Sequence, residues 1–167
     1  MTSDYSTNSK LTKTLISCLQ EWGIQSLTDI QTRAVEAEVP LGSSAIVCAP
    51  TSSGKTLIGE LALANALSNG LDALYLVSHK ALAEQKFSDF AYRFSGPTWA
   101  SAVTVVGIST GDREEGDVNC RLLVSTYEKA LGLILAGRLR VSKTVIIADE
   151  LQILGEAGRV MTLGEAD

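Results

Sequence analysis

Residues 45–56 read AIVCAPTSSGKT, and this stretch decides the fold of the 167-residue chain. Its first four residues, 45–48, form a continuous apolar run, which predicts a strand that is covered on both faces. Apolar residues at helical spacing follow between positions 57 and 67, and Asn69-Gly70 is a typical helix stop. A loop between a buried strand and a helix start is the setting of a phosphate-binding loop.

The residue types in this loop suit a nucleotide. Its backbone N–H groups and the helix dipole can surround a β-phosphate, and Gly54 lets the backbone approach closely. Lys55 supplies positive charge to the β- and γ-phosphates, and the Thr56 hydroxyl can bind Mg²⁺. Ala49 stands where the usual pattern has its first glycine. The alternative is a solvated turn at a helix start. We predict that ATP is bound by Thr51, Ser52, Ser53, Gly54, Lys55 and Thr56.

Two carboxylates follow a second apolar run, residues 145–148. Asp149 and Glu150 are costly to bury at a strand end unless they meet a metal or a proton relay. Asp149 is placed to hold Mg²⁺, and Glu150 to orient and deprotonate an attacking water. The alternative is an ordinary acidic loop.

Strands and helices alternate along the rest of the chain, which predicts βαβ units and a parallel sheet. The predicted class is α/β, a RecA-like P-loop domain with helices on both faces of a mostly parallel sheet. Residues 1–7 are expected to be a flexible tail, and residues 8–167 one partial ATP-binding domain. Strands are expected at 73–77, 103–108, 122–125 and 144–148, helices at 11–22, 28–34, 79–94 and 127–136, and a polar loop at 110–117.

Charge and composition exclude several classes. The formal net charge of −5, from 14 basic and 19 acidic residues, argues against a basic protein that coats nucleic acid. Three widely spaced cysteines and one histidine do not predict a zinc site or a disulfide framework. No signal peptide or membrane span is evident, so no membrane partner is expected. A cytoplasmic location is expected, at the nucleoid in a prokaryote or in the nucleus of a eukaryote.

These motifs give the chain a family resemblance from about Gly23 to Leu154. It resembles the first RecA-like motor domain of superfamily-two DExD/H-box helicases, and within them the branch of Ski-like and archaeal repair helicases. The family's Q motif, which hydrogen-bonds adenine, is similar to a segment containing Gly23, Ile24, Leu27, Gln31 and Ala34. Motif II reads Asp149-Glu150-Leu151-Gln152, where relatives usually carry His or Asp in the fourth place. The resemblance implies catalytic roles for Lys55, Glu150 and Gln152.

The resemblance also implies contacts with a nucleic-acid backbone. Residues 78–85, SHKALAEQ, are similar to motif Ia, with Lys80 in place of the usual arginine. Thr110 and Gly111 resemble motif Ib, and Thr126 begins a Thr-x-Glu-Lys pattern typical of this branch. These patterns favour single-stranded DNA over RNA as the partner.

Two family parts do not occur in the sequence, motif III and the second RecA-like domain that supplies arginine fingers. We therefore expect a fragment of a longer helicase that binds ATP and Mg²⁺ but hydrolyses ATP little. The absent motif III strand belongs beside the phosphate-loop strand, so exposed apolar surface is expected there. The missing domain or another chain is expected to fill that gap.

Other functions remain open at this point. A double-strand translocase motor shares the ATPase parts, although the Thr-x-Glu-Lys pattern argues against it. A non-catalytic nucleic-acid-binding scaffold would not need intact Lys55, Thr56, Asp149 and Glu150. A small-molecule P-loop kinase needs a substrate lid and an acceptor site, and neither is evident.

Overall fold

The computed structural model describes residues 2–3, 5, 8–50, 52–99 and 106–150. Five helices in this part are α1 (Lys13–Glu21), α2 (Asp29–Glu36), α3 (Lys55–Ser68), α4 (Lys80–Arg93) and α5 (Tyr127–Leu135). The strands are β1 (Thr2–Ser3), β2 (Leu27–Thr28), β3 (Asp72–Val77), β4 (Val106–Ser109), β5 (Glu114–Glu115), β6 (Leu122–Thr126) and β7 (Thr144–Ala148). Short 3₁₀ turns occupy Val39–Leu41 and Pro97–Trp99.

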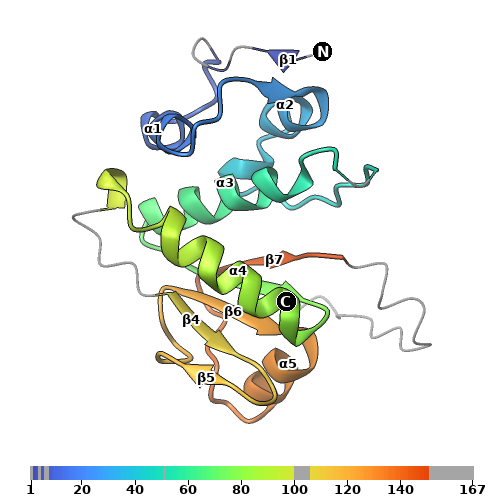
Figure 1. The fold of residues 1–167 in the computed structure, drawn as a ribbon, viewed down its shortest axis with the longest axis vertical. Helices are drawn as coiled ribbons and strands as arrows, with labels where there is room; N and C mark the ends of the chain where they lie inside the picture. Colours follow the sequence, from blue (N-terminus) through green and yellow to red (C-terminus); the bar gives the residue numbers. More distant parts are fainter. Residues whose placement is uncertain (1, 4, 6–7, 51, 100–105, 151–167) are drawn as a thin grey trace.

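The main sheet has the order β5-β4-β6-β3-β7 (Figure 1). β3 pairs in parallel with both β6 and β7, and β4 pairs in parallel with β6, whereas β5 runs antiparallel to β4. The mostly parallel α/β class is therefore confirmed. Parallel pairing brings the carboxyl ends of β3, β4, β6 and β7 to one edge, where ligands bind in open α/β sheets.

The two faces of the sheet bury different residues because side chains alternate along a strand. Tyr75 and Val124 belong to the larger core, which also includes Leu61 of α3 and Phe90 of α4. Leu74 and Leu123 point to the opposite face, where they pack with Leu133 of α5 and residues near it. Helices thus cover both faces, as the sequence predicts.

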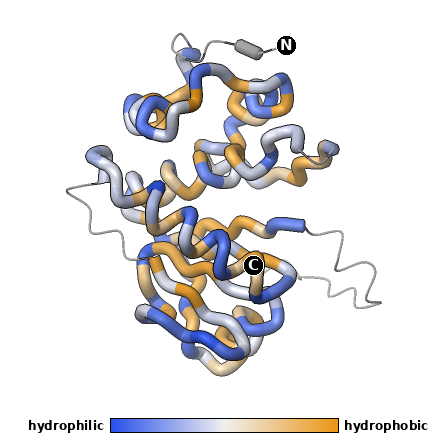
Figure 2. Tube along the Cα trace, in the orientation of Figure 1, coloured by the Kyte–Doolittle hydropathy of each residue, from blue (hydrophilic) through white to orange (hydrophobic). Residues whose placement is uncertain are grey.

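The N-terminal helices form a separate layer. α1 and α2 lie over α3 on the side away from the sheet, so α3 is enclosed between them and the sheet (Figure 1). This position explains why α3 is apolar nearly all round, with Leu61, Leu63 and Ala64 all fully buried. In Figure 2 the central strands are hydrophobic, and the hairpin around β5 is hydrophilic.

Two sequence-based expectations about elements are wrong. Residues 45–48 form no strand, and Ile46 is 82% exposed. A strand needs a partner for its backbone groups, and among the described residues none pairs with this segment. The expected polar loop at 110–117 contains β5, which pairs with the end of β4.

Exposed apolar surface lies near the phosphate loop, although the phosphate-loop strand beside which it was expected does not form. β7 is the last strand of the sheet, and its outer edge has no strand partner within the described residues. Ile146 of β7 is 48% exposed, and Ile46 is more exposed still.

Candidate functional site

The phosphate loop combines two left-handed residues with the start of a helix. Ser52 and Gly54 both have positive φ, 64° and 90°, and α3 begins at Lys55 directly after them. Alternating left-handed residues turn successive N–H groups toward one concave side, which makes an anion-binding turn. The Ser53 hydroxyl is buried there and has no hydrogen-bond partner among the described residues. A loop with this hydroxyl donor and a helix start fits a nucleotide phosphate.

Lys55 lies folded over this loop. Its Nζ donates to the Ala49 carbonyl at 2.5 Å and to the Pro50 carbonyl at 2.9 Å. The positive charge therefore sits at the concave side of the loop, where a phosphate would exchange for these carbonyl contacts. The Thr56 side chain, one residue on, is exposed.

The start of α2 hydrogen-bonds the backbone of the phosphate loop. Thr28 and Gln31 form the expected capping box of α2, in which Gln31 Oε1 accepts from the Thr28 N–H at 2.8 Å. Gln31 Nε2 donates to the Gly54 carbonyl at 3.0 Å, and Thr28 Oγ1 donates to the Ser53 carbonyl at 3.2 Å. Gln31 is only 5% exposed, and its hydrogen bond to Gly54 holds the phosphate loop directly. Its contact with adenine stays a prediction.

Asp149 is held by three neighbours. The Tyr75 hydroxyl donates to Asp149 Oδ2 at 2.7 Å, and the Tyr127 hydroxyl donates to the Asp149 carbonyl at 2.7 Å. The Asp149 N–H extends the β3–β7 ladder to the Leu76 carbonyl at 2.9 Å. Burial, followed by the Asp149 carboxylate, raises the pKa of Tyr75 far above its usual value. Burial, then Asp149 and Glu150, raises the pKa of Tyr127 to about 12, so both hydroxyls stay protonated donors.

Glu150 is exposed at the end of β7 and has a left-handed backbone, with φ 55°. Its Oε2 accepts a hydrogen bond from the Ser78 hydroxyl at 3.4 Å. The Ser78 Oγ in turn lies 2.8 Å from His79 Nδ1. The carboxylate is therefore accessible to water, as a general base requires.

The phosphate-loop helix lies directly against β7. A Cβ built on Gly59 of α3 would lie 3.2 Å from Ile147 Cγ2, so a larger residue there would require Ile147 to shift by a few tenths of an ångström. The loop and the two carboxylates thus come to the same edge of the sheet. No hydrogen bond or ion pair joins Lys55 or Thr56 to Asp149 or Glu150 in the part of the chain that the structure describes. Two predicted site residues, Thr51 and Gln152, lie outside that part.

The predicted nucleic-acid residues lie along the same edge, after β3, β4 and β6. Lys80 forms an ion pair with Asp112 and packs against Gly111, where an added Cβ would meet Lys80 Cε at 3.2 Å. Thr110 is 2% exposed and its Oγ1 accepts from the Arg113 N–H at 3.2 Å. Thr126 is 8% exposed and caps α5 through the Lys129 N–H at 3.4 Å. Lys80 and Gly111 are brought together, whereas both threonine hydroxyls are engaged within the chain.

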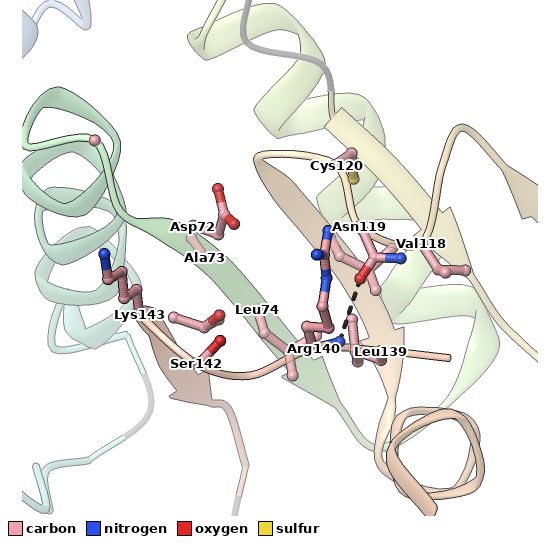
Figure 3. A pocket seen from close by; sticks show the side chains of 13 residues that line it. Asp72, Ala73, Leu74, Val118, Asn119, Cys120, Leu139, Arg140, Ser142 and Lys143 are labelled. Carbon is pink, nitrogen blue, oxygen red and sulfur yellow. Dashed lines mark hydrogen bonds between the residues drawn. The ribbon is translucent and has the colours of Figure 1, made fainter. Parts of the chain in front are cut away.

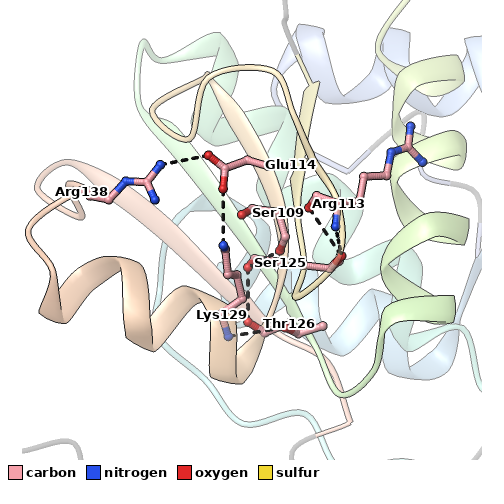
Figure 4. A network of polar contacts seen from close by, with 8 residues as sticks. Ser109, Arg113, Glu114, Ser125, Thr126, Lys129 and Arg138 are labelled. Carbon is pink, nitrogen blue, oxygen red and sulfur yellow. Dashed lines mark hydrogen bonds and ion pairs between the residues drawn. The ribbon is translucent and has the colours of Figure 1, made fainter.

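Around these residues a polar network joins β4, β5, β6 and α5 (Figure 4). The Ser125 hydroxyl donates to the Ser109 carbonyl at 2.7 Å. Glu114 pairs with Lys129 at 3.4 Å and with Arg138 at 3.0 Å. The hydrogen bond from Lys129 lowers the pKa of Glu114. The network fixes the loop that carries Thr110 and Gly111.

A cavity of about 250 Å³ lies away from this edge. Its lining includes Asp72 and Thr144, the first residues of β3 and β7, so it opens at the amino ends of the strands (Figure 3). Asn119 Oδ1 accepts from the Arg140 N–H there at 3.2 Å. None of the predicted site residues lines it.

Sequence reasoning missed the two tyrosines that hold Asp149 and the loop contacts of Thr28. Tyr75 and Asp149 are 74 positions apart, and the only signal is the inward position of Tyr75 on an alternating strand. For Thr28, the sequence did contain a signal of its contact with the loop, because the capping box is recognisable and lies near the predicted loop.

Fold and site together define a RecA-like P-loop domain of the helicase type. Residues 28–165 match the family model of the DEAD/DEAH box helicases. The chain belongs to the DEAD/DEAH box helicase family.

Similar curated proteins support this family membership. The chain is 34% identical over 150 residues to the ATP-dependent DNA helicase Hel308 of Pyrococcus horikoshii, and 36% over 151 residues to that of Pyrococcus abyssi. Each match covers 87% of this chain and 20% of the relative. The chain therefore spans about a fifth of the length of these relatives. Helicases of this kind use ATP, generally with Mg²⁺.

Solved structures share the fold. S. cerevisiae Dbp5 L327V, bound to RNA and ADP BeF3, has a TM-score of 0.72 at 16% identity and matches 93% of this chain and 40% of its own. The DUF1998 helicase MrfA, bound to DNA and AMPPNP, has a TM-score of 0.71 at 21% identity, over 91% of this chain and 22% of its own. No helix among the described residues has the length and apolar character of a membrane span.

Proposed function

We propose that this chain is the ATP-binding motor domain of an ATP-dependent helicase that unwinds nucleic acid, with DNA favoured over RNA. The observation that carries the proposal is the phosphate loop beside Asp149 and Glu150. The loop contains Lys55 and the buried hydroxyl of Ser53, and α3 begins directly after it. α3 packs against β7, and the two carboxylates follow β7. The similarity to archaeal DNA helicases supports DNA as the substrate.

Each residue has a role in this proposal. The loop N–H groups and Lys55 bind the β- and γ-phosphates, and Gln31 holds the loop in shape and lies near the adenine. Glu150 orients the attacking water and accepts its proton. Lys80 and the N–H groups around Gly111 and Thr126 hold backbone phosphates of the single strand. Thr51 and Gln152 keep their proposed roles in nucleotide binding and catalysis.

The oxygen donors near the loop suit Mg²⁺, a hard cation that prefers carboxylate and hydroxyl oxygen. Thr56 and Asp149 would hold it, and the bound ion would neutralise charge that develops on the phosphates. A second RecA-like domain would complete the site, because its arginine typically contributes ~10³–10⁵ in rate. We propose that this chain alone binds ATP with little turnover, and that the complete protein acts in the cytoplasm or at the DNA.

The direct test is a titration of this chain with ATP in the presence of Mg²⁺. Lys55→Ala removes the cation of the loop, so we expect a loss of at least tenfold in ATP affinity. Lys13→Ala removes an exposed cation of α1 and is the matched control, with no expected effect. An unchanged affinity in Lys55→Ala would show that the loop is not a nucleotide site. A strand-displacement assay on a longer protein that contains this chain then separates a helicase from a double-strand translocase.

A further inference from the structure

The Tyr75 side chain connects the centre of the sheet to Asp149. β3 and β7 pair in register up to Leu76 and Ala148, so Asp149 is the first residue beyond the ladder. The Tyr75 ring is buried beside it and is 1% exposed. Its hydroxyl reaches Asp149 Oδ2 at 2.7 Å. In the described part of the chain, no other side chain hydrogen-bonds this carboxylate.

This hydrogen bond has a fixed direction. An ionised carboxylate can only accept a hydrogen bond, so the Tyr75 phenol is the donor and Asp149 Oδ2 is the acceptor. A carboxylate with one oxygen held by a donor cannot rotate freely about its last bond. Oδ1 and the second lone pair of Oδ2 then remain available to a cation or to its water ligands.

The ring itself is held on both sides. Phe90 of α4 contacts it edge-to-face with centroids 4.9 Å apart, and Lys86 Nζ lies 5.7 Å from its centroid. On the α3 side, a Cβ on Gly59 would lie 3.7 Å from Tyr75 Cε2. The helix that starts at Lys55 and Thr56 therefore packs on the same ring that holds Asp149. Tyr75 thus contacts both elements that carry the proposed metal site, α3 with Thr56 and the end of β7 with Asp149.

We propose, building on the nucleotide-binding function above, that Tyr75 is a positioning residue for Mg²⁺. Its hydroxyl sets the orientation of the Asp149 carboxylate relative to the Thr56 hydroxyl at the start of α3. It touches neither nucleotide nor metal, and it acts through Asp149.

Tyr75→Phe tests this assignment because it removes one oxygen and keeps the ring packing. The quantity measured is the affinity of the 167-residue chain for a non-hydrolysable ATP analogue, with Mg²⁺ and with EDTA. We expect the gain that Mg²⁺ gives to fall about tenfold, the lower end of the effect of one hydrogen bond to a charged group. Affinity in EDTA should stay within twofold of the unmodified chain. Because the EDTA affinity is measured on the same sample, it reports loss of the fold separately.

Tyr127→Phe is the matched control. It also removes a hydroxyl that donates at 2.7 Å, but to the Asp149 backbone carbonyl. Because Tyr127 holds the Asp149 backbone and not its carboxylate, we expect the Mg²⁺-dependent gain to fall clearly less than in Tyr75→Phe. A merely structural role for Tyr75 predicts equal effects of the two changes, and that outcome overturns the proposal.

A double-mutant cycle tests whether Tyr75 acts through Asp149. In an Asp149→Ala background, Tyr75→Phe should have no further effect on the Mg²⁺-dependent gain, since the acceptor is absent. A full effect there would contradict action through Asp149. If the unmodified chain shows no gain from Mg²⁺, the proposed function fails together with this assignment. If that gain is present and Tyr75→Phe keeps it, only the role of Tyr75 fails.

Discussion

The side-chain amide of Gln31 donates to the backbone carbonyl of Gly54 across 3.0 Å, and so joins the start of α2 to the phosphate loop. The opposite end of the same amide accepts from the Thr28 N–H. The loop shape therefore depends on a buried side chain 23 residues before Gly54, in addition to its own glycine and serines.

We expect Gln31→Ala to cost about 1–3 kcal/mol of stability, because it leaves the Gly54 carbonyl and the Thr28 N–H unpaired. Affinity for ATP and for GTP should fall by similar factors, since the loop binds phosphates common to both. Isothermal titration with the two nucleotides measures this, and Gln25→Ala, an exposed glutamine, is the control. A loss confined to ATP would instead assign Gln31 to the adenine.

Gly54→Ala should destabilise the chain more than Gly70→Ala does. Both glycines have positive φ, 90° and 77°, so both substitutions have the left-handed strain of about 1–2 kcal/mol. A Cβ at Gly54 would also lie 2.2 Å from Gln31 Nε2, whereas nothing lies within 4 Å at Gly70. Urea denaturation of the two variants compares them. Equal destabilisation would mean that Gln31 moves aside without cost.

Glu60 should make stability fall as pH rises. It is buried in α3, 3.4 Å from Arg93, and burial raises its pKa above the usual value despite Arg93 and Lys86. The folded state then holds this proton more tightly than the unfolded state, so the stabilisation is full at low pH and is lost as pH rises through the folded pKa. The stability of the unmodified chain relative to Glu60→Gln should therefore decrease from pH 4.5 to neutral pH. Thermal unfolding of both across this range measures the difference, and a difference that grows with pH contradicts the expected sign.

Asp112→Asn should increase affinity for single-stranded DNA. Asp112 pairs with Lys80 and competes with a phosphate for the same ammonium group. We expect a gain of about two- to fivefold at low salt, and a loss in Lys80→Glu for every sequence tested. Fluorescence anisotropy with a labelled oligonucleotide measures both. Glu36→Gln makes the same change of charge on α2, and an equal gain there would indicate a general field effect instead.

Local sequence patterns were sufficient to predict most helices and strands, and also the parts of the candidate site that are contiguous in sequence. The capping box at Thr28 and Gln31, the helix start at Lys55 and the strand before Asp149 were all predicted. Each depends on residues only a few positions apart, and at these places the surrounding structure agrees with the local signal.

Contacts between distant segments were not predictable in the same way. Alternation places Tyr75 on the inner side of β3, but it does not show that its hydroxyl reaches a carboxylate on the neighbouring strand. Residues 45–48 illustrate the opposite error, because an apolar run indicates a strand only if a neighbour supplies hydrogen bonds. Ile46 lies in solvent for that reason.

Among the described residues no strand pairs with the outer edge of β7, and this has a consequence for how the chain behaves in concentrated solution. Free backbone N–H and C=O groups beside Ile146 can template another extended segment, and a second molecule offers the same edge. Self-association through this edge grows with concentration, and misassembled aggregates become a hazard during expression. A charged residue at position 146 would oppose such stacking, so a side chain far from the phosphate loop in sequence would influence the solubility of the chain.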